Sequence, residues 1–251
     1  MKIRFLGAHN AESSAFRLPG ILLDGKIAFD CGSVARSLSE QEILNVRNVF
    51  LTHRHYDHIR DVVPVAITHF QNGSSFDIWG NADTERAIQQ CLYNHILYSD
   101  FFKKEVASFH EIENDKLIEC LDYRITPVEV IHGIPASGFY VEKDGKSFLY
   151  TGDMTVGSVS CWDGVCPDIL ITEVTADDSY AEKFSKGPHL TPKLLKEELL
   201  VFKDKFGYIP MVYAVHMTPS LETQIRRELG DLSDELGCII VPGTEDLEID
   251  T

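Results

Sequence analysis

The chain has 251 residues, of which 44% are hydrophobic and 25% charged, and its formal net charge is −16. This composition is typical of a globular protein and argues against a disordered or fibrous chain. The acidic charge argues against a long nucleic acid as partner, because such binding depends on Lys and Arg that neutralise phosphates. No apolar run approaches about 20 residues, and residues 1–6 are too short for a signal peptide. We therefore expect one cytoplasmic domain over residues 1–251, with no membrane partner.

The six cysteines are scattered without the C-x-x-C spacing of a zinc or redox site. Most of them adjoin apolar residues, so buried free thiols are expected. Cys161 and Cys166 are the one pair close enough in sequence for a local disulfide, which we do not predict.

Three strands are expected near the N-terminus. Residues 1–7 alternate weakly, and residues 20–24 and 27–29 are apolar runs joined by a Gly-Lys turn, the pattern of a β-hairpin. Asp30 follows this hairpin directly. Further along, the segment Ser39-Glu40-Gln41-Glu42 fits a capping box that opens a short helix.

The densest cluster of metal-ligand residue types follows a predicted buried strand at residues 46–51. The cluster reads Thr52-His53-Arg54-His55-Tyr56-Asp57-His58. On an extended chain, His53 and His55 project to one side and can hold one ion. Asp57 and His58 lie beyond the bend and can reach a second ion about 3.5–4 Å away. The spacing therefore predicts a two-metal hydrolytic site.

Helical patterns follow the cluster. Residues 59–70 are apolar with helical spacing, and a helix that starts at Asn81 or Asp83 is expected to run to about Ser99. Residues 93–102 are unusually aromatic for a surface segment. They predict either core packing or the wall of a pocket for a flat base, and the sequence leaves both readings open.

A series of strands comes next. They are predicted at residues 76–79, 116–118, 123–130, 137–141, 147–150 and 168–173. His132 and Asp153 follow the ends of two of these strands, and Glu173 ends a third. Function concentrates in the loops that follow strands, so these three are candidate site residues.

The C-terminal third alternates strands and helices. Thr191 and the proline after it predict the start of a helix over residues 193–206, and His189 lies just before this start. An apolar strand at residues 210–215 delivers His216. Two further elements are expected, a helix at residues 219–229 and a strand at residues 238–241. The order suits two facing β-sheets with helices on their outer faces, an α+β fold of the αββα type.

The segment His53-Arg54-His55-Tyr56-Asp57-His58 resembles the signature of the metallo-β-lactamase superfamily of hydrolases. The resemblance implies the metallo-β-lactamase fold and two metal ions. One ion would be held by His53, His55 and His132, the other by Asp57, His58 and His216, with Asp153 as the bridge. Asp30 matches the first motif of the family, a carboxylate that orients the metal ligands from behind.

The second half of the chain resembles class II cyclic-nucleotide phosphodiesterases within that superfamily. The likeness rests on Thr172-Glu173-Val174, on Gly187-Pro188-His189-Leu190-Thr191-Pro192, and on Ala214-Val215-His216-Met217-Thr218-Pro219. Class B β-lactamases have Cys where this chain has Asp153, so antibiotic hydrolysis is not expected. Thr218 stands where the phosphodiesterases have Lys, so a basic contact near the phosphate is expected to be missing.

The resemblance implies a dinuclear-metal phosphodiesterase that hydrolyses a small phosphodiester, above all a 3′,5′-cyclic nucleotide, by attack of a hydroxide that bridges the ions. The implied catalytic residues are Asp57, His189 as the acid that protonates the leaving oxygen, and Glu173, which orients His189. A helix-cap neighbour without a chemical role is the alternative for His189. Zinc is the expected metal, with manganese and iron as alternatives. The alternative function is a ribonuclease Z-like nuclease or another hydrolase of this fold, and a monomer and a homodimer both fit.

Overall fold

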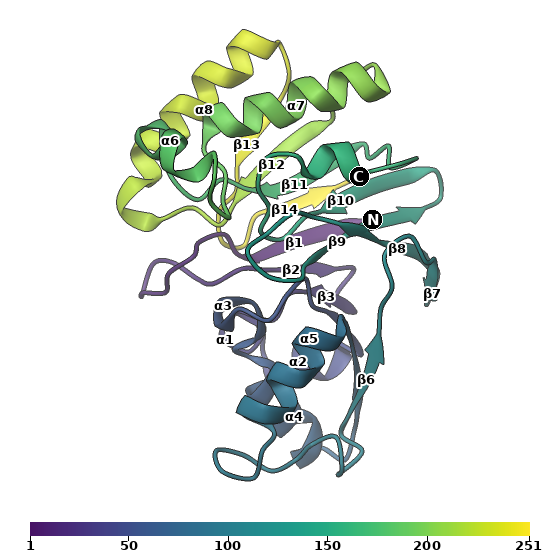
Figure 1. Cartoon of the computed structure of the whole chain (residues 1–251). Coiled ribbons are helices and arrows are strands. Elements are labelled where there is room, and N and C mark those ends of the chain that lie inside the picture. Colours follow the sequence, from purple (N-terminus) through teal and green to yellow (C-terminus); the bar gives the residue numbers. More distant parts are fainter.

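Two seven-stranded β-sheets face each other in the computed structural model, which describes residues 1–251 (Figure 1). The first sheet has the order β14 (Glu248–Asp250), β1 (Lys2–Gly7), β2 (Gly20–Leu23), β3 (Ile27–Phe29), β4 (Asn48–Phe50), β5 (Phe76–Gly80) and β6 (Ala107–Glu111). The second has the order β13 (Ile240–Pro242), β12 (Met211–Val215), β11 (Ile169–Glu173), β10 (Lys146–Tyr150), β9 (Ser137–Lys143), β8 (Tyr123–Glu129) and β7 (Ile118–Cys120).

Helices cover the outer face of each sheet. The first sheet carries α1 (Val34–Ser37), α2 (Glu40–Asn45), α4 (Val62–Gln71) and α5 (Ala82–Ala87), with the short α3 (Tyr56–Ile59) at its edge. The second carries α7 (Pro192–Phe206) and α8 (Glu222–Leu236), with α6 (Ala181–Phe184) beside them. The αββα architecture expected from the order of elements is therefore confirmed.

Apolar side chains between the two sheets form a shared core. The ring of Phe29 lies against those of Phe50, Phe139 and Phe148, with centroids 5.4, 5.6 and 5.8 Å away. All four side chains are fully buried, and burying each one contributes roughly 1.5–3 kcal/mol to stability. Two further apolar clusters fill the space between each sheet and its outer helices. The sheets are thus fixed face to face, so loops at their common edge are held in place.

Strand direction places the candidate ligands at that edge. The strands β3 to β6 are parallel in the first sheet, and β10 to β13 are parallel in the second. The carboxyl ends of parallel strands lie on the same side of a sheet. The loops after β3, β4, β10, β11 and β12 therefore meet, and these loops hold most of the residues singled out above.

Several helix ends follow the predicted signals. Ser39 and Glu42 form a reciprocal capping box at α2. The side chain of Thr191 accepts the backbone N–H of Leu194 at α7, which ends at Gly207 in the left-handed conformation. α8 is longer than expected, since it runs on to Leu236, and a 3-10 turn (Pro219–Leu221) precedes it.

Other boundaries differ from the predictions. The helix expected to reach Ser99 ends at Ala87 and continues only as a π-helical turn (Ile88–Leu92). Tyr93 and Phe101 of the aromatic segment are buried in the core under α4, while Ile96 is 84% exposed. Tyr93 and Phe101 therefore pack in the core, while the exposed residues between them lie outside the two cavities that His132 lines.

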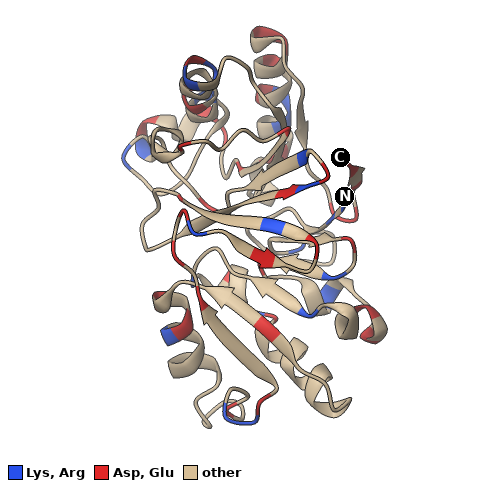
Figure 2. Ribbon diagram, turned by 90° about the vertical axis from the view of Figure 1, so that its right-hand side faces the viewer, with Lys and Arg blue, Asp and Glu red and all other residues tan.

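All six cysteines are free thiols, and Cys161 and Cys166 form no disulfide. Only Cys31 and Cys120 are buried, so the expectation of buried thiols is wrong for the exposed Cys91, Cys161 and Cys166. None of the helices is both long and apolar enough to cross a membrane. Figure 2 shows Lys and Arg scattered among Asp and Glu rather than gathered in one basic stripe.

Candidate metal centre

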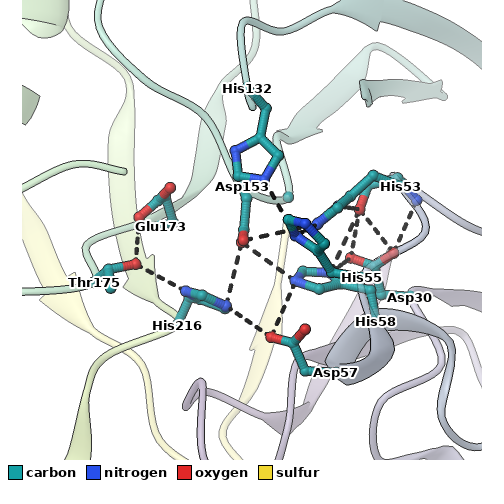
Figure 3. A network of polar contacts seen from close by, with 12 residues as sticks. Asp30, His53, His55, Asp57, His58, His132, Asp153, Glu173, Thr175 and His216 are labelled. Atoms are coloured by element: carbon teal, nitrogen blue, oxygen red, sulfur yellow. Dashed lines mark hydrogen bonds and ion pairs between the residues drawn. The ribbon is translucent and has the colours of Figure 1, made fainter. Parts of the chain in front are cut away.

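Side chains from both sheets converge at the shared edge (Figure 3). His53 and His55 lie between β4 and α3, and Asp57 and His58 belong to α3. The remaining three donors come from the second sheet: His132 from the β8–β9 loop, Asp153 from the loop after β10 and His216 from the end of β12. The fold thus unites donors that are up to 163 residues apart in sequence.

The first group of donors combines three imidazoles. His55 Nδ1 lies 2.9 Å from His53 Nε2 and 3.3 Å from His132 Nε2. Asp153 Oδ2 is 3.8 Å from His53 Nε2. These four side chains offer ligand atoms that all lie within 4.8 Å of one another.

The second group lies on the other side of Asp153. His216 Nε2 is 3.1 Å from Asp57 Oδ2, and His58 Nε2 is 3.6 Å from the same oxygen. Asp153 Oδ1 lies 3.3 Å from His58 Nε2 and 3.4 Å from His216 Nε2. One oxygen of Asp153 therefore faces each group, the arrangement expected of a bridging carboxylate.

Hydrogen bonds behind the site fix which ring nitrogen of each histidine faces the centre. His58 Nδ1 donates to Asp30 Oδ2 at 2.6 Å, and His132 Nδ1 donates to the carbonyl oxygen of Pro188 at 2.9 Å. Since a carboxylate and a carbonyl can only accept, both Nδ1 atoms carry the proton. The Nε2 lone pairs are therefore directed at the centre.

Two threonine hydroxyls fix which ring nitrogen of His53 and of His216 faces the centre. Thr52 Oγ1 donates to Asp30, so it accepts the Nδ1 proton of His53 at 3.0 Å. Thr175 Oγ1 donates to Glu173 at 2.5 Å, so it accepts the Nδ1 proton of His216 at 2.9 Å. Such outer partners orient metal ligands and raise their basicity.

Asp30 anchors the first-sheet side of the centre. The carboxylate is fully buried and accepts the backbone N–H and hydroxyl of Thr52, the Nδ1 proton of His58 and the hydroxyl of Tyr150. Its own backbone has a φ of 58°, a strained conformation for a residue with a side chain. Asp30 thus contacts the candidate ligand His58 directly and the candidate ligand His53 through Thr52.

The donor set fits divalent cations. His53 and His132 direct their Nε2 lone pairs at His55 Nδ1, and His58 Nε2 and Asp153 Oδ1 are buried without a hydrogen-bond partner. Burial and the neighbouring imidazoles hold the pKa of His53 well below its usual range. Although burial alone would raise it, the nearby His216 and His58 hold the pKa of Asp153 well below its usual range. Neutral imidazole and ionised carboxylate are the forms that bind zinc and related ions.

Glu173 and His189 border this centre. Glu173 is fully buried at the end of β11; its Oε1 accepts the backbone N–H of Met154 at 3.0 Å and the Nδ1 proton of His189 at 2.9 Å. Burial alone would lower the pKa of His189, but Glu173 raises it to about 9. His189 Nδ1 is 3.8 Å from Asp153 Oδ2, and its side chain remains 21% exposed. His189 is therefore both close to the centre and open to a substrate.

Supporting residues were missed by the sequence reasoning. Thr52 directly precedes the candidate ligand His53, and Thr175 lies two residues after Glu173. A polar side chain so close to a candidate site residue was the signal that could have identified both. Tyr150, which donates to Asp30, lies 120 residues from it, and the Pro188 contact to His132 uses a backbone carbonyl. Neither contact has a signal in the sequence.

Comparison with protein families gives a match to the β-lactamase superfamily domain over residues 26–221. Ribonuclease Z of Methanopyrus kandleri is 30% identical over 149 residues, which cover 56% of this chain and 50% of that protein. Ribonuclease Z of Acaryochloris marina is 28% identical over 172 residues, 62% of this chain and 52% of that protein. The chain thus matches about half the length of these relatives.

Solved structures share the whole fold at low sequence identity. Unliganded yeast PDE1 aligns over 100% of this chain and 99% of its own, with a TM-score of 0.80 and 16% identity. The metallo-β-lactamase fold protein YhfI from Bacillus subtilis has a TM-score of 0.75 at 15% identity, covering 100% of this chain and 98% of that one. The short form of human tRNase Z has a TM-score of 0.70 at 18% identity, covering 100% and 99%. With its family match and its two facing sheets, the chain belongs to the metallo-β-lactamase superfamily.

Proposed function

We propose that this chain is a dinuclear-metal phosphodiesterase that hydrolyses a small phosphodiester, with 3′,5′-cyclic nucleotides as the expected class. The observation that carries the proposal is the position of Asp153, whose two oxygens face two separate groups of histidine donors. The superfamily match supports metal-dependent hydrolysis, and the His189–Glu173 pair beside the centre supports a leaving group that needs a proton.

Two divalent cations, zinc or else manganese or iron, would supply a water activated near neutral pH and neutralise charge on the phosphoryl oxygens. His53, His55 and His132 would hold one cation, Asp57, His58 and His216 the other, and Asp153 both. The chain's own contribution is to hold these donors in a fixed orientation. Asp30, Thr52, Thr175 and the Pro188 carbonyl do so by accepting the Nδ1 proton of four imidazole rings, which leaves Nε2 of each ring directed at the centre.

His189 is the proposed general acid. Its Nδ1 proton is held by Glu173, which leaves Nε2 available for the leaving oxygen of the substrate. The backbone N–H of Leu190 donates to the other Glu173 oxygen at 3.2 Å, so the carboxylate and the ring are fixed to the same loop. This geometry orients His189 in the way that a buried carboxylate orients a catalytic histidine in other hydrolases.

The proposal of a small substrate rests on charge. The net charge of −16 disfavours a polyanion. The alternative is a ribonuclease Z-like nuclease, and the specific observation in its favour is the 30% identity to the Methanopyrus kandleri protein. The chain matches only half of that relative's length, so its substrate does not carry over directly.

The test combines metal analysis with a substrate panel. We expect two transition-metal ions per chain and turnover of cyclic mononucleotides and bis(p-nitrophenyl) phosphate, with a weak dependence of KM on salt. Cleavage of precursor transfer RNA with a KM that rises steeply between 50 and 200 mM salt would instead support the nuclease. A purified chain that binds no transition metal would contradict both functions.

A further inference from the structure

A pair of aromatic rings lies next to the proposed acid. The ring centroid of Phe184 is 5.7 Å from that of His189, and the ring of Tyr180 is 5.8 Å from that of Phe184. The His189 ring is in turn 5.5 Å from the ring of His132 and 5.5 Å from that of His216, one candidate ligand from each donor group. The rings thus form a row, which runs from the candidate ligands through His189 to Phe184 and Tyr180.

The two aromatic side chains are partly open to solvent. Tyr180 is 37% exposed and Phe184 is half-buried, whereas Ala181 between them makes the buried contact of α6. Lys183 Nζ lies 5.8 Å from the ring centroid of Tyr180 and 5.9 Å from that of Phe184, so a cation–π contact holds the pair together. Exposed rings beside a candidate metal centre can bind the flat part of a ligand.

Backbone hydrogen bonds fix the position of the pair. The backbone N–H of Asp178 donates to Glu228 at 2.8 Å, which ties the 3-10 turn Asp178–Tyr180 to α8. The backbone N–H of Ser185 donates to the Ala181 carbonyl at 2.8 Å and closes the single turn of α6. The rings therefore need little ordering when a ligand binds, which lowers the entropic cost of binding.

A nucleotide presents its groups in the same order as this row of rings. Its phosphate would lie at the donor groups and its 3′ oxygen at His189, and the base follows on the sugar that carries this oxygen, which would bring it to Phe184. Every base has a π face, so stacking on an aromatic ring tolerates any base. Residues 93–102, the other aromatic segment considered for a flat base, have Tyr93 and Phe101 buried in the core.

We propose that Phe184 and Tyr180 form a stacking platform for the base of a nucleotide substrate. The inference rests on the proposed function for the chemistry at the metal centre, and it narrows the substrate to phosphodiesters whose leaving oxygen belongs to a nucleoside. The platform favours nucleotides over phosphodiesters that lack a base, and it does not select among the bases.

The binding test compares adenosine 5′-phosphate with ribose 5-phosphate, by calorimetry on the metal-loaded chain at constant ionic strength. We expect the adenosine ligand to bind about tenfold more tightly, which equals about 1.4 kcal/mol and lies within the usual contribution of one stacked base. The ratio should fall to about one in Phe184→Leu, which keeps an apolar side chain against the core and removes the π face. It should persist in Phe184→Tyr and fall in part in Tyr180→Leu.

Phe206→Leu is the matched control. Phe206, like Phe184, is half-buried, packs against the same apolar cluster and has a lysine, Lys205, over its ring. It is the last residue of α7, so it lies about 20 Å along the helix from the end that follows His189. This variant should keep the binding ratio of the unmodified chain.

A fluorescent ligand separates stacking from a general loss of structure. The fluorescence of 2-aminopurine riboside 5′-phosphate falls when its base stacks on an aromatic ring. We expect the unmodified chain and Phe206→Leu to quench it, and Phe184→Leu to leave it bright. Equal affinity of the unmodified chain for adenosine 5′-phosphate and ribose 5-phosphate would overturn the platform, as would a ratio that survives in Phe184→Leu or is lost equally in Phe206→Leu.

Turnover of 3′,5′-cyclic AMP distinguishes the platform from the proposed function. If both hold, Phe184→Leu should raise KM about tenfold and change kcat little, because the platform binds the substrate and its transition state alike. No hydrolysis, together with a binding ratio that depends on Phe184, would refute the phosphodiesterase and support the platform. Hydrolysis with the same KM in Phe184→Leu and a binding ratio of one would overturn the platform and leave the phosphodiesterase standing.

Discussion

Thr175 Oγ1 accepts the Nδ1 proton of His216 at 2.9 Å. Because the same hydroxyl donates to Glu173, one buried carboxylate supports both the candidate ligand His216 and the candidate acid His189. The two halves of the proposed chemistry, metal binding and proton transfer, therefore share a support at the end of β11. Loss of the Glu173 carboxylate should therefore weaken both metal binding and proton transfer.

The contact predicts a metal-affinity defect in Thr175→Val, which keeps the shape of the side chain and removes the acceptor. We expect the affinity for the ion assigned to Asp57, His58 and His216 to fall by about 10–100-fold, the usual effect of losing such an outer partner. Thr175→Ser keeps a hydroxyl and should retain most of the affinity. Chelator competition measures both variants, and unchanged affinity in Thr175→Val would remove the orienting role.

Asp153→Ala should abolish turnover and leave fewer than two ions per chain, because the carboxylate faces both donor groups. Elemental analysis and kcat measure the effect. Asp163→Ala, which removes a surface carboxylate paired with Lys205, is the control and should keep both ions. If Asp153→Ala held two ions and kept near-normal activity, the bridging assignment would be wrong.

Substitution of Gly152 tests how closely the loop that carries Asp153 packs against Thr52, the residue before His53. Its φ is 59°, and a Cβ at this position would lie 2.7 Å from the side chain of Thr52. Gly25 also has a positive φ, 69°, but open space around it. We expect Gly25→Ala to lose about 1–2 kcal/mol of stability from the left-handed backbone alone. Gly152→Ala should lose roughly 1–3 kcal/mol more from the clash. Urea unfolding of the metal-free chain measures both, and equal losses would contradict the close packing.

Much of this site was predictable because its donors sit in short local patterns. His53, His55, Asp57 and His58 follow one strand within six residues, and Asp153 and His216 each follow an apolar run. The carboxyl ends of parallel strands lie at the same edge of a sheet, so the convergence of these residues can be predicted without the exact register of strand pairing. The assignment of each donor to an ion remains a prediction that the variants above test.

Contacts over long sequence distances were not predictable. β14 pairs with β1 across the whole chain, and its residues 248–250 give no clear strand pattern. The helix after Asn81 stops early because Tyr93 and Phe101 are drawn into the core, and Asn94 then caps a turn by accepting the N–H of Ile96. Tertiary burial overrides helical propensity there.

Glu245 predicts an acid-dependent loss of stability. Burial alone would raise the pKa of this carboxyl, but hydrogen bonds from His9 at 2.7 Å and from the Arg17 backbone N–H at 2.9 Å lower it below 4.5. A carboxyl with a lowered pKa in the folded state stabilises the fold above its ordinary pKa, and this contribution is lost as pH falls through the folded value. Glu245→Gln should therefore be less stable than the parent at pH 7, with a difference that shrinks below pH 4.5. A difference that stays constant between pH 7 and pH 3 would contradict the shift.

His189 gives the sharpest test of the chemistry. Its Nδ1 donates to Glu173 although Asp153 Oδ2 lies 3.8 Å away, and we propose that its Nε2 contacts the substrate. His189→Ala should keep both ions and lower kcat on a cyclic nucleotide by about 10²–10⁴-fold, the usual contribution of a general acid. A p-nitrophenyl ester has a leaving group that needs no proton, and should lose much less. Equal losses on both substrates would reject the acid role and leave His189 as a phosphate-binding residue, while loss of an ion would make it a ligand or a support. Glu173→Gln should keep the His189 hydrogen bond and shift the pH profile of kcat, since a neutral amide no longer favours the protonated ring.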